Sequence, residues 1–346
     1  MSDSLEIYGY TFPELVMDIV SFFSDRDIKS KFINEKNGLN MEFGFKVPMD
    51  FCEYHKKKYY DLKDNRKIMI QPRLIAKICN ILWENSILTK IRLAMINDID
   101  GGMGEVFYRP SPLSIDSKQC YISYLNNIVY GFKFIYNTNK SNVLPIIIEK
   151  SGRPGIGTCF RTIYGIVTAK HCLEVDKVQI GKNETIISPN RLYNAPIYAM
   201  DNYDIAVISI VPSVNENIAP FRFGEPEVLD EVITMGFPKH SGFDNFITTT
   251  AGNISAIENS YIYKHDLMLL TTRIRGGNSG GPVINKKGEV VGIVTETPYG
   301  EEVVTNSGLF EYDKFGYGLS IPQKYIIETN KNQIPFTRSI EFVDNL

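Results

Sequence analysis

The sequence predicts a mainly β protein in which a helix-rich N-terminal domain precedes two antiparallel β-barrels. After about residue 125, short apolar runs such as residues 143–148 and 290–294 alternate with turn signals, a pattern typical of barrels. Before that point, longer segments carry apolar residues at helical spacing. A length of 346 residues suits about two domains, which we expect at residues 1–125 and 126–330, with a tail at 331–346.

The N-terminal domain is expected to contain two helices and a β-hairpin. Residues 12–23 and 72–84 have apolar residues on one helical face, and Pro72 suits the first turn of a helix. Two strands are expected at residues 88–95 and 105–108. A helix followed by a hairpin resembles a winged-helix module, and this match depends on the pattern of elements alone.

A basic stretch in the N-terminal domain has two interpretations. Between His55 and Arg92 there are ten Lys or Arg residues against three Asp or Glu residues. Such a stretch can contact a phosphate backbone, or it can be a solvated face of a helix or loop. Residues 1–120 as a whole hold 17 basic and 17 acidic residues, so the solvated face is favoured. A protein-binding or signal-sensing role for this domain stays open.

The second part of the chain contains a serine among glycines, in the run Gly276-Gly277-Asn278-Ser279-Gly280-Gly281-Pro282. Glycines permit positive φ angles and let the main chain approach a ligand closely. Backbone N–H groups beside a serine can hold the oxyanion that forms when the serine attacks a carbonyl. The alternative is a glycine-rich turn with an ordinary serine. A nucleophilic serine needs a base, and the base needs an orienting acid.

The candidate base and acid both lie next to apolar β runs. Of the four histidines, His171 follows the run at residues 165–168, which brings its imidazole to the end of a strand. Asp204 opens the apolar run at residues 205–210, whereas Asp201 falls on the preceding turn, so Asp204 is the preferred acid. The other histidines have no such setting; they are His55, His240 and His265.

These motifs, in this order and spacing, resemble the trypsin-like (chymotrypsin-fold) serine peptidases, and among them the compact HtrA/Deg-like branch without a PDZ domain. The resemblance covers roughly residues 140 to 330. Four blocks carry it: Gly155-Ile156-Gly157-Thr158-Cys159-Phe160, Thr168-Ala169-Lys170-His171, Asp204-Ile205-Ala206-Val207 and Gly277-Asn278-Ser279-Gly280-Gly281-Pro282. Two weaker blocks agree: Met235-Gly236-Phe237-Pro238 and Gly318-Leu319-Ser320-Ile321-Pro322.

The resemblance implies a serine endopeptidase that cleaves protein substrates through an acyl-enzyme. Ser279 would attack the scissile carbonyl, His171 would take and return the proton, and Asp204 would orient the imidazole. The N–H groups of Gly277 and Ser279 would form the oxyanion hole.

Two positions depart from the pattern of the family. Asn278 stands where trypsin-type zymogens carry an aspartate that pairs with a new N-terminal amine, so activation by N-terminal insertion is not expected. Cys159 lies too far along the chain to match the first cysteine of the disulfide that secreted members carry, so its bond to Cys172 is in doubt.

The resemblance also suggests residues that contact the substrate. Counting six residues back from the nucleophile reaches Arg273, whose charge would favour acidic side chains. Thr295 and Glu296 would form the strand beside the substrate, and Glu296 would oppose an acidic substrate. Gly318 and Ser320 would form the opposite wall.

The composition argues against membrane, secreted and metal-binding classes. The net charge is −3, and no apolar run approaches the roughly 20 residues that span a bilayer. The acidic start at residues 1–6 lacks the features of a secretory signal. Five sparse cysteines suit a reducing compartment, and no His, Cys or acid cluster has metal-ligand spacing. We therefore expect a cytoplasmic protein with no metal, no cofactor and no membrane partner.

Two functions follow for the whole chain. In the first, the domain at residues 1–125 recruits the protein substrate of the peptidase, or senses a signal through a regulatory partner. In the alternative, this domain binds DNA or RNA and the peptidase is the effector of a nucleic-acid-responsive regulator.

Overall fold

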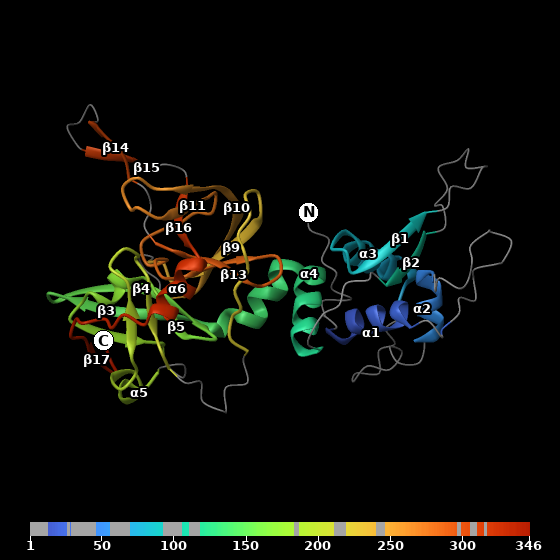
Figure 1. Ribbon diagram of the computed structural model, residues 1–346, viewed down its shortest axis with the longest axis horizontal. Coiled ribbons are helices and arrows are strands. Elements are labelled where there is room, and N and C mark those ends of the chain that lie inside the picture. The colour runs from blue at the N-terminus through green and yellow to red at the C-terminus, as the bar shows by residue number, and fades with distance from the viewer. Residues whose placement is uncertain are drawn as a thin grey trace. The chain divides into compact units, whose positions relative to one another are not determined.

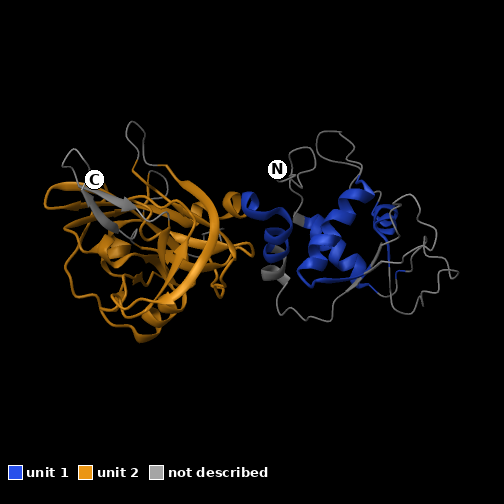
Figure 2. Cartoon of the chain, turned by 90° about the horizontal axis from the view of Figure 1, so that it is seen from above, with its two compact units in different colours: residues 1–134 blue, residues 135–346 orange. Residues whose placement is uncertain are grey.

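The computed structural model is mainly β, with helices concentrated in the N-terminal part of the chain (Figure 1). The chain forms two compact units, residues 1–134 and 135–346 (Figure 2). In the described part of the chain, no helix is both long enough and apolar enough to span a membrane. The described residues are 13–25, 28, 46–55, 70–92, 106–110, 118–182, 187–210, 219–239, 246–295, 299–304, 310–314 and 317–346.

The first unit packs short helices against a two-stranded antiparallel sheet. Its elements are α1 (Pro13–Ser24), α2 (Pro48–Tyr54), α3 (Pro72–Glu84), β1 (Leu88–Arg92) and β2 (Val106–Pro110). Each of these helices has a proline in its first turn, where the missing N–H is not needed. The core is aromatic and aliphatic: the ring of Phe22 lies edge-on to Phe23 and Phe51, at 5.3 and 5.4 Å between centroids.

The sequence predicted these elements closely. The helix expected at residues 72–84 is α3 with the same bounds, and the helix expected at 12–23 is α1, shifted by one residue. The two expected strands are β1 and β2, and residues 98–104 between them lie outside the described residues, as do residues 56–69 of the basic stretch. The winged-helix interpretation stays a prediction.

A long helix, α4 (Lys118–Asn139), runs across the boundary between the two compact units. Its backbone is interrupted at Gly131, which has φ 68° and ψ −161°. Such a conformation is open to glycine and strained for other residues. Leu125 and Val129, before the interruption, are buried in the core of the first unit.

The second unit begins with a curled seven-stranded sheet in the order β17-β6-β3-β4-β5-β8-β7. The strands are β3 (Val143–Lys150), β4 (Arg153–Thr162), β5 (Gly165–Thr168), β6 (Lys177–Ile180), β7 (Ile197–Ala199), β8 (Ala206–Ile208) and β17 (Glu341–Phe342), with α5 (Pro189–Tyr193) between β6 and β7. Neighbouring strands are antiparallel except for β17 and β6. The apolar runs that predicted the strands fill the core of this sheet.

The C-terminal residues lie along both edges of this sheet. The N–H of Phe336 donates to the carbonyl of Ile197 in β7 at 2.8 Å, and β17 pairs with β6 at the opposite edge. Ile340, between these contacts, is buried in the sheet's core. The tail therefore satisfies hydrogen-bonding groups of two edge strands that would otherwise be open.

The remaining strands form a closed antiparallel barrel in the order β10-β11-β16-β13-β12-β9. They are β9 (Glu231–Gly236), β10 (Thr248–Asn259), β11 (Asp266–Leu270), β12 (Pro282–Asn285), β13 (Val290–Val294) and β16 (Gly318–Pro322). A hairpin of β14 (Tyr299–Val304) and β15 (Phe310–Lys314) and the helix α6 (Lys324–Asn332) complete the unit. The Ser279 run leads directly into β12, and Asp204 lies between β7 and β8, so the two barrels each supply part of the site.

Candidate active site

The chain reversal after β5 brings His171 to Asp204. Residues Lys170–Leu173 form a 3₁₀ turn, and Asp204 lies in the loop between β7 and β8. Nδ1 of His171 lies 2.7 Å from Oδ2 of Asp204, and the backbone N–H of His171 donates to Oδ1 at 2.9 Å. Both carboxylate oxygens therefore hold one residue, which fixes the position and orientation of the imidazole. Asp201 contributes only its carbonyl oxygen nearby, as an acceptor from Lys170.

The His171–Asp204 contact shifts the pKa of each partner. Burial lowers the pKa of the imidazole, but the hydrogen bonds and charges of Asp204 and Cys172 together outweigh burial and raise the pKa above its ordinary value of 6.5. Burial raises the pKa of Asp204, whereas the hydrogen bonds from His171 and Thr295 bring it below its ordinary 3.8. The contact with Asp204 thus stabilises the imidazolium that forms when His171 accepts a proton.

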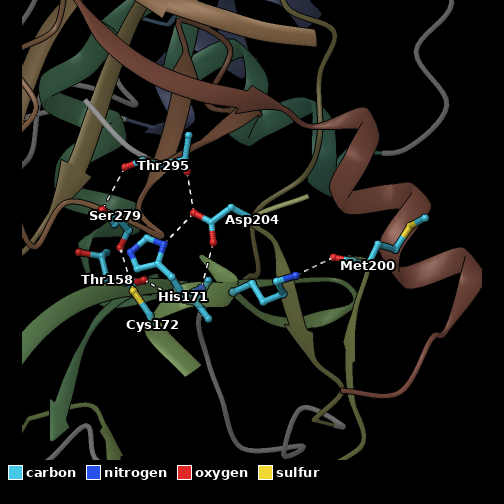
Figure 3. Close-up of polar contacts among 9 residues, drawn as sticks. Thr158, His171, Cys172, Met200, Asp204, Ser279 and Thr295 are labelled. Carbon is cyan, nitrogen blue, oxygen red and sulfur yellow. Dashed lines mark hydrogen bonds and ion pairs between the residues drawn. The ribbon is translucent and has the colours of Figure 1, made fainter. Parts of the chain in front are cut away.

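Ser279 is connected to Asp204 through Thr295, the residue that follows β13. The Ser279 hydroxyl donates to the Thr295 carbonyl at 3.0 Å, and the Thr295 hydroxyl donates to Oδ2 of Asp204 at 2.6 Å. Figure 3 shows the imidazole of His171 between the Asp204 carboxylate and Ser279. Among the described residues, no hydrogen bond joins Ser279 Oγ to His171. The Ser279 hydroxyl is therefore hydrogen-bonded to the Thr295 carbonyl and lies next to the imidazole of His171.

The turn at Ser279 has anchored carbonyl groups and, among the described residues, two N–H groups without an acceptor. Gly277 has φ 99°, and a Cβ there would overlap the carbonyl oxygen of Phe237, so only glycine fits. The Thr158 hydroxyl donates to the Gly277 carbonyl at 2.7 Å, and the N–H of Lys239 donates to the Gly276 carbonyl at 3.2 Å. The N–H groups of Gly277 and Ser279 have no acceptor within the described part of the chain.

Hydrogen bonds to the Ser279 carbonyl and from the Gly280 N–H hold the backbone of the nucleophile. The N–H of Thr158 donates to the Ser279 carbonyl at 2.9 Å, and the N–H of Gly280 donates to the Val294 carbonyl at 2.7 Å. Gly280 has φ 85°, and a Cβ there would overlap the Thr158 carbonyl. Thr158 lies on β4 of the first sheet, so this strand supports the serine turn of the second barrel.

The residues expected to contact the substrate differ in how far they are exposed. Arg273 is exposed, and Ile274 packs over Gly318 closely enough to overlap any Cβ placed there. Ser320 is fully buried, and its hydroxyl donates to the Met268 carbonyl at 3.5 Å within the barrel. Thr295 is the contact of Ser279 and Asp204 described above. Glu296 and His240 lie outside the described residues.

Sequence reasoning missed two residues that organise the site. Thr158 bonds to the serine turn through both its backbone and its hydroxyl, and Lys170 donates to the carbonyls of Met200 and Asp201 at 3.3 and 3.4 Å. Thr158 lies in a buried strand between Gly157 and Cys159. Because a buried hydroxyl needs a hydrogen-bond partner, its position in an apolar strand could have indicated a structural contact.

Neither cysteine near His171 is bonded to the other. Cys159 and Cys172 are buried free thiols, and burial raises the pKa of Cys159. The Sγ of Cys172 lies 3.9 Å from the Ser279 carbonyl oxygen. In the described part of the chain, no group of three or more His, Cys, Asp or Glu side chains is placed to hold a metal ion.

A curled sheet that supplies His171 and Asp204, next to a closed barrel that supplies Ser279, is an arrangement typical of trypsin-like serine peptidases. Residues 155–293 match the model of the trypsin-like peptidase domain. The solved structures that the chain is similar to include a protease of Mycobacterium tuberculosis, Rv3671c in its active form, at 17% identity with a TM-score of 0.45, covering 59% of this chain and 86% of that one. Another is the HtrA-type protease AlgW with a tripeptide, at 21% identity with a TM-score of 0.43, covering 58% and 62%.

Curated relatives are proteases of the HtrA/Deg type. A probable periplasmic serine endoprotease, DegP-like, of Chlamydia pneumoniae is 30% identical over 164 residues, which are 45% of this chain and 29% of the relative. The magnetosome formation protease MamE of Paramagnetospirillum magneticum is 31% identical over 175 residues, 49% and 22% of the two chains. The chloroplastic protease Do-like 2 of Arabidopsis thaliana is 31% identical over 145 residues, 40% and 23%. The chain spans less than a third of the length of these relatives.

The expectation of a cytoplasmic location is wrong. The relatives carry names that place them in the periplasm, the chloroplast or the magnetosome. Sparse cysteines were a weak guide, because a domain of this size buries enough apolar surface to fold without disulfides in any compartment.

Proposed function

We propose that this protein is a serine endopeptidase that hydrolyses peptide bonds of protein substrates through His171, Asp204 and Ser279. The observation that carries the proposal is the two-point contact between Asp204 and His171, joined through Thr295 to the hydroxyl of Ser279. The match of residues 155–293 to the trypsin-like peptidase domain supports the same reaction.

In the proposed reaction, the Ser279 hydroxyl turns from the Thr295 carbonyl toward Nε2 of His171. The imidazole takes the hydroxyl proton as Ser279 Oγ bonds to the scissile carbonyl carbon. His171 then gives the proton to the leaving amine, and an acyl-enzyme remains. A water molecule, deprotonated by the same imidazole, hydrolyses the ester. Asp204 stabilises the imidazolium in both steps, in keeping with the raised pKa of His171.

The negative charge that develops on the carbonyl oxygen needs donors that are already in place. We assign this role to the N–H groups of Gly277 and Ser279, which have no acceptor among the described residues. The Gly276 carbonyl, which accepts from the N–H of Lys239, shares a peptide plane with the Gly277 N–H, and the Asn278 carbonyl, which accepts from the N–H of Gly281, shares one with the Ser279 N–H. These planes are kept from rotating, so the donors need little reorganisation when the charge forms.

For the whole chain we propose domains at residues 1–125, 126–330 and 331–346, of which the first, a winged-helix adaptor or sensor, recruits substrate or receives a signal. A separate hydrophobic core in the first unit supports an independent role. The nucleic-acid alternative depended on the basic stretch, and six of its ten basic residues lie outside the described residues. Measuring peptidase activity with and without a candidate protein partner tests the sensor role, and unchanged activity with every partner would count against it.

Labelling with a fluorophosphonate probe tests the proposed reaction. The wild type should be labelled, and Ser279→Ala and His171→Ala should lose the label. Ser209→Ala, which changes a serine on the chain beside β8, is the matched control and should label like the wild type. A folded wild type without label, or a label that persists in Ser279→Ala, would contradict the proposal.

A further inference from the structure

The loop that carries Asp204 is not part of a strand ladder. It comprises residues 200–205, and turns and bends occupy residues 201–204 between the short strands β7 and β8. A segment without a hydrogen-bonded ladder takes its position from whatever packs on it. The contacts of this loop therefore decide where the carboxylate of Asp204 lies.

The side chain of Tyr203, next to Asp204, is held by α6 and by His265. Its ring centroid lies 4.4 Å from that of Tyr325 and 5.3 Å from that of His265, which meets it edge-on. Its hydroxyl donates to Oε2 of Glu328 at 3.2 Å. One tyrosine thus joins the acid loop to α6 by a tilted contact between aromatic rings and by a hydrogen bond to a carboxylate.

The helix α6 is attached at the same time to the closed barrel. It follows β16 directly, and the N–H of Asp266, the first residue of β11, donates to the hydroxyl of Tyr325 at 3.0 Å. Lys324 forms an ion pair with the Asp266 side chain. Tyr325 therefore contacts the acid loop with its ring and the closed barrel with its hydroxyl.

We propose that Tyr203, Tyr325 and Glu328 are positioning residues, which set the Asp204 loop of the first sheet against the barrel that supplies Ser279. Asp204 and Ser279 come from different barrels, so their alignment needs a link that spans both. On the opposite side, Lys170 holds the carbonyls of Met200 and Asp201. This inference depends on the proposed function, because positioning matters only if His171 and Asp204 activate Ser279.

Variants at Tyr203 test the inference in the full-length chain. Tyr203→Leu removes both the ring and the hydroxyl, whereas Tyr203→Phe keeps the ring and removes only the bond to Glu328. Tyr193→Leu is the matched control, because Tyr193 in α5 is 76% exposed. The measurements are the rate of fluorophosphonate labelling across pH and the urea midpoint of unfolding.

We expect Tyr203→Leu to label about tenfold more slowly than the wild type, since an aromatic pair and a hydrogen bond are lost together. The acid limb of its pH profile, where the labelling rate falls as His171 becomes protonated, should move to lower pH. An Asp204 carboxylate that is held less firmly raises the pKa of His171 less. Tyr203→Phe should recover most of the rate. If Tyr203→Leu fails to fold, Glu328→Leu, which removes only the acceptor, should slow labelling by a smaller factor.

The outcomes separate the two proposals. A folded wild type that is not labelled overturns the proposed function itself. A labelled wild type whose Tyr203→Leu variant matches Tyr193→Leu at every pH overturns the positioning role alone. A lower urea midpoint with an unchanged acid limb would assign Tyr203 a structural role only, and this also overturns the inference.

Discussion

Replacing Asp204 by asparagine should separate two effects of this carboxylate on His171. The negative charge raises the pKa of the imidazole, and Oδ2 accepts a hydrogen bond from Nδ1, which keeps the proton on that nitrogen. Asparagine is neutral and can present its N–H₂ group to Nδ1, which would place the proton on Nε2. An imidazole in that tautomer cannot accept the Ser279 proton. We therefore expect the maximal labelling rate to fall by about 10⁴-fold.

The pH profile should change in a direction fixed by the charge. At an effective dielectric constant of about 20, unit charges about 4 Å apart attract by about 4 kcal/mol. The His171 side chain is 41% exposed, so solvent screening reduces this value, and a shift of about 1 to 2 pKa units remains. Because neutral imidazole is the active form, the acid limb of Asp204→Asn should lie about 1 to 2 pH units below that of the wild type.

The assay is the rate of fluorophosphonate labelling between about pH 4 and pH 10, with the His171 imidazole followed by NMR. Asp201→Asn is the matched control, because this neighbouring acid contributes only its carbonyl oxygen to the loop contacts. An acid limb that stays in place in Asp204→Asn, or that moves in Asp201→Asn instead, would refute the reasoning.

Three further changes have outcomes that the contacts determine. Gly280→Ala should lower the free energy of unfolding in urea by about 2 to 4 kcal/mol, because the positive φ and the overlap with the Thr158 carbonyl leave no room for a Cβ. Gly276→Ala is its control and should change this free energy by less than about 0.5 kcal/mol, because no described atom lies within 4 Å of a Cβ added there. Thr158→Val removes the hydroxyl that holds the Gly277 carbonyl, so labelling should slow by about tenfold or more; an unchanged rate would show that the turn holds itself. Ile340→Ala should cost about 2 to 4 kcal/mol of unfolding free energy, and a loss below about 0.5 kcal/mol would mean that the tail does not stabilise the sheet.

The fold class could be predicted from the sequence because its signals are local. The helix at α3 begins at Pro72 and has an apolar stripe, and both features act within one element. Gly277 and Gly280 have the positive φ angles that the glycine run suggested. Asp204 was preferred over Asp201 from its place at the start of an apolar strand, and it is the residue that contacts His171.

The long-range contacts that bring these local features together could not be predicted from the sequence. Thr158 is 119 residues from Gly277, and Tyr203 is 125 residues from Glu328. A single hydroxyl or carboxylate has no periodic pattern, so nothing in one sequence indicates its distant partner. The location was also misjudged, because cysteine number reflects how much a core needs support more than where the protein resides.

A site divided between two barrels depends on these long-range contacts more than on its own motifs. The His171–Asp204 pair belongs to the first sheet and the Ser279 turn to the closed barrel. Thr158 joins the serine turn to the first sheet from one side, while Tyr203 and α6 join the acid loop to the closed barrel from the other. Thr295 contacts both Asp204 and Ser279 at the centre. Small shifts between the barrels would therefore change the alignment of base and nucleophile while leaving each barrel intact, so variants at these links should reduce activity more than stability.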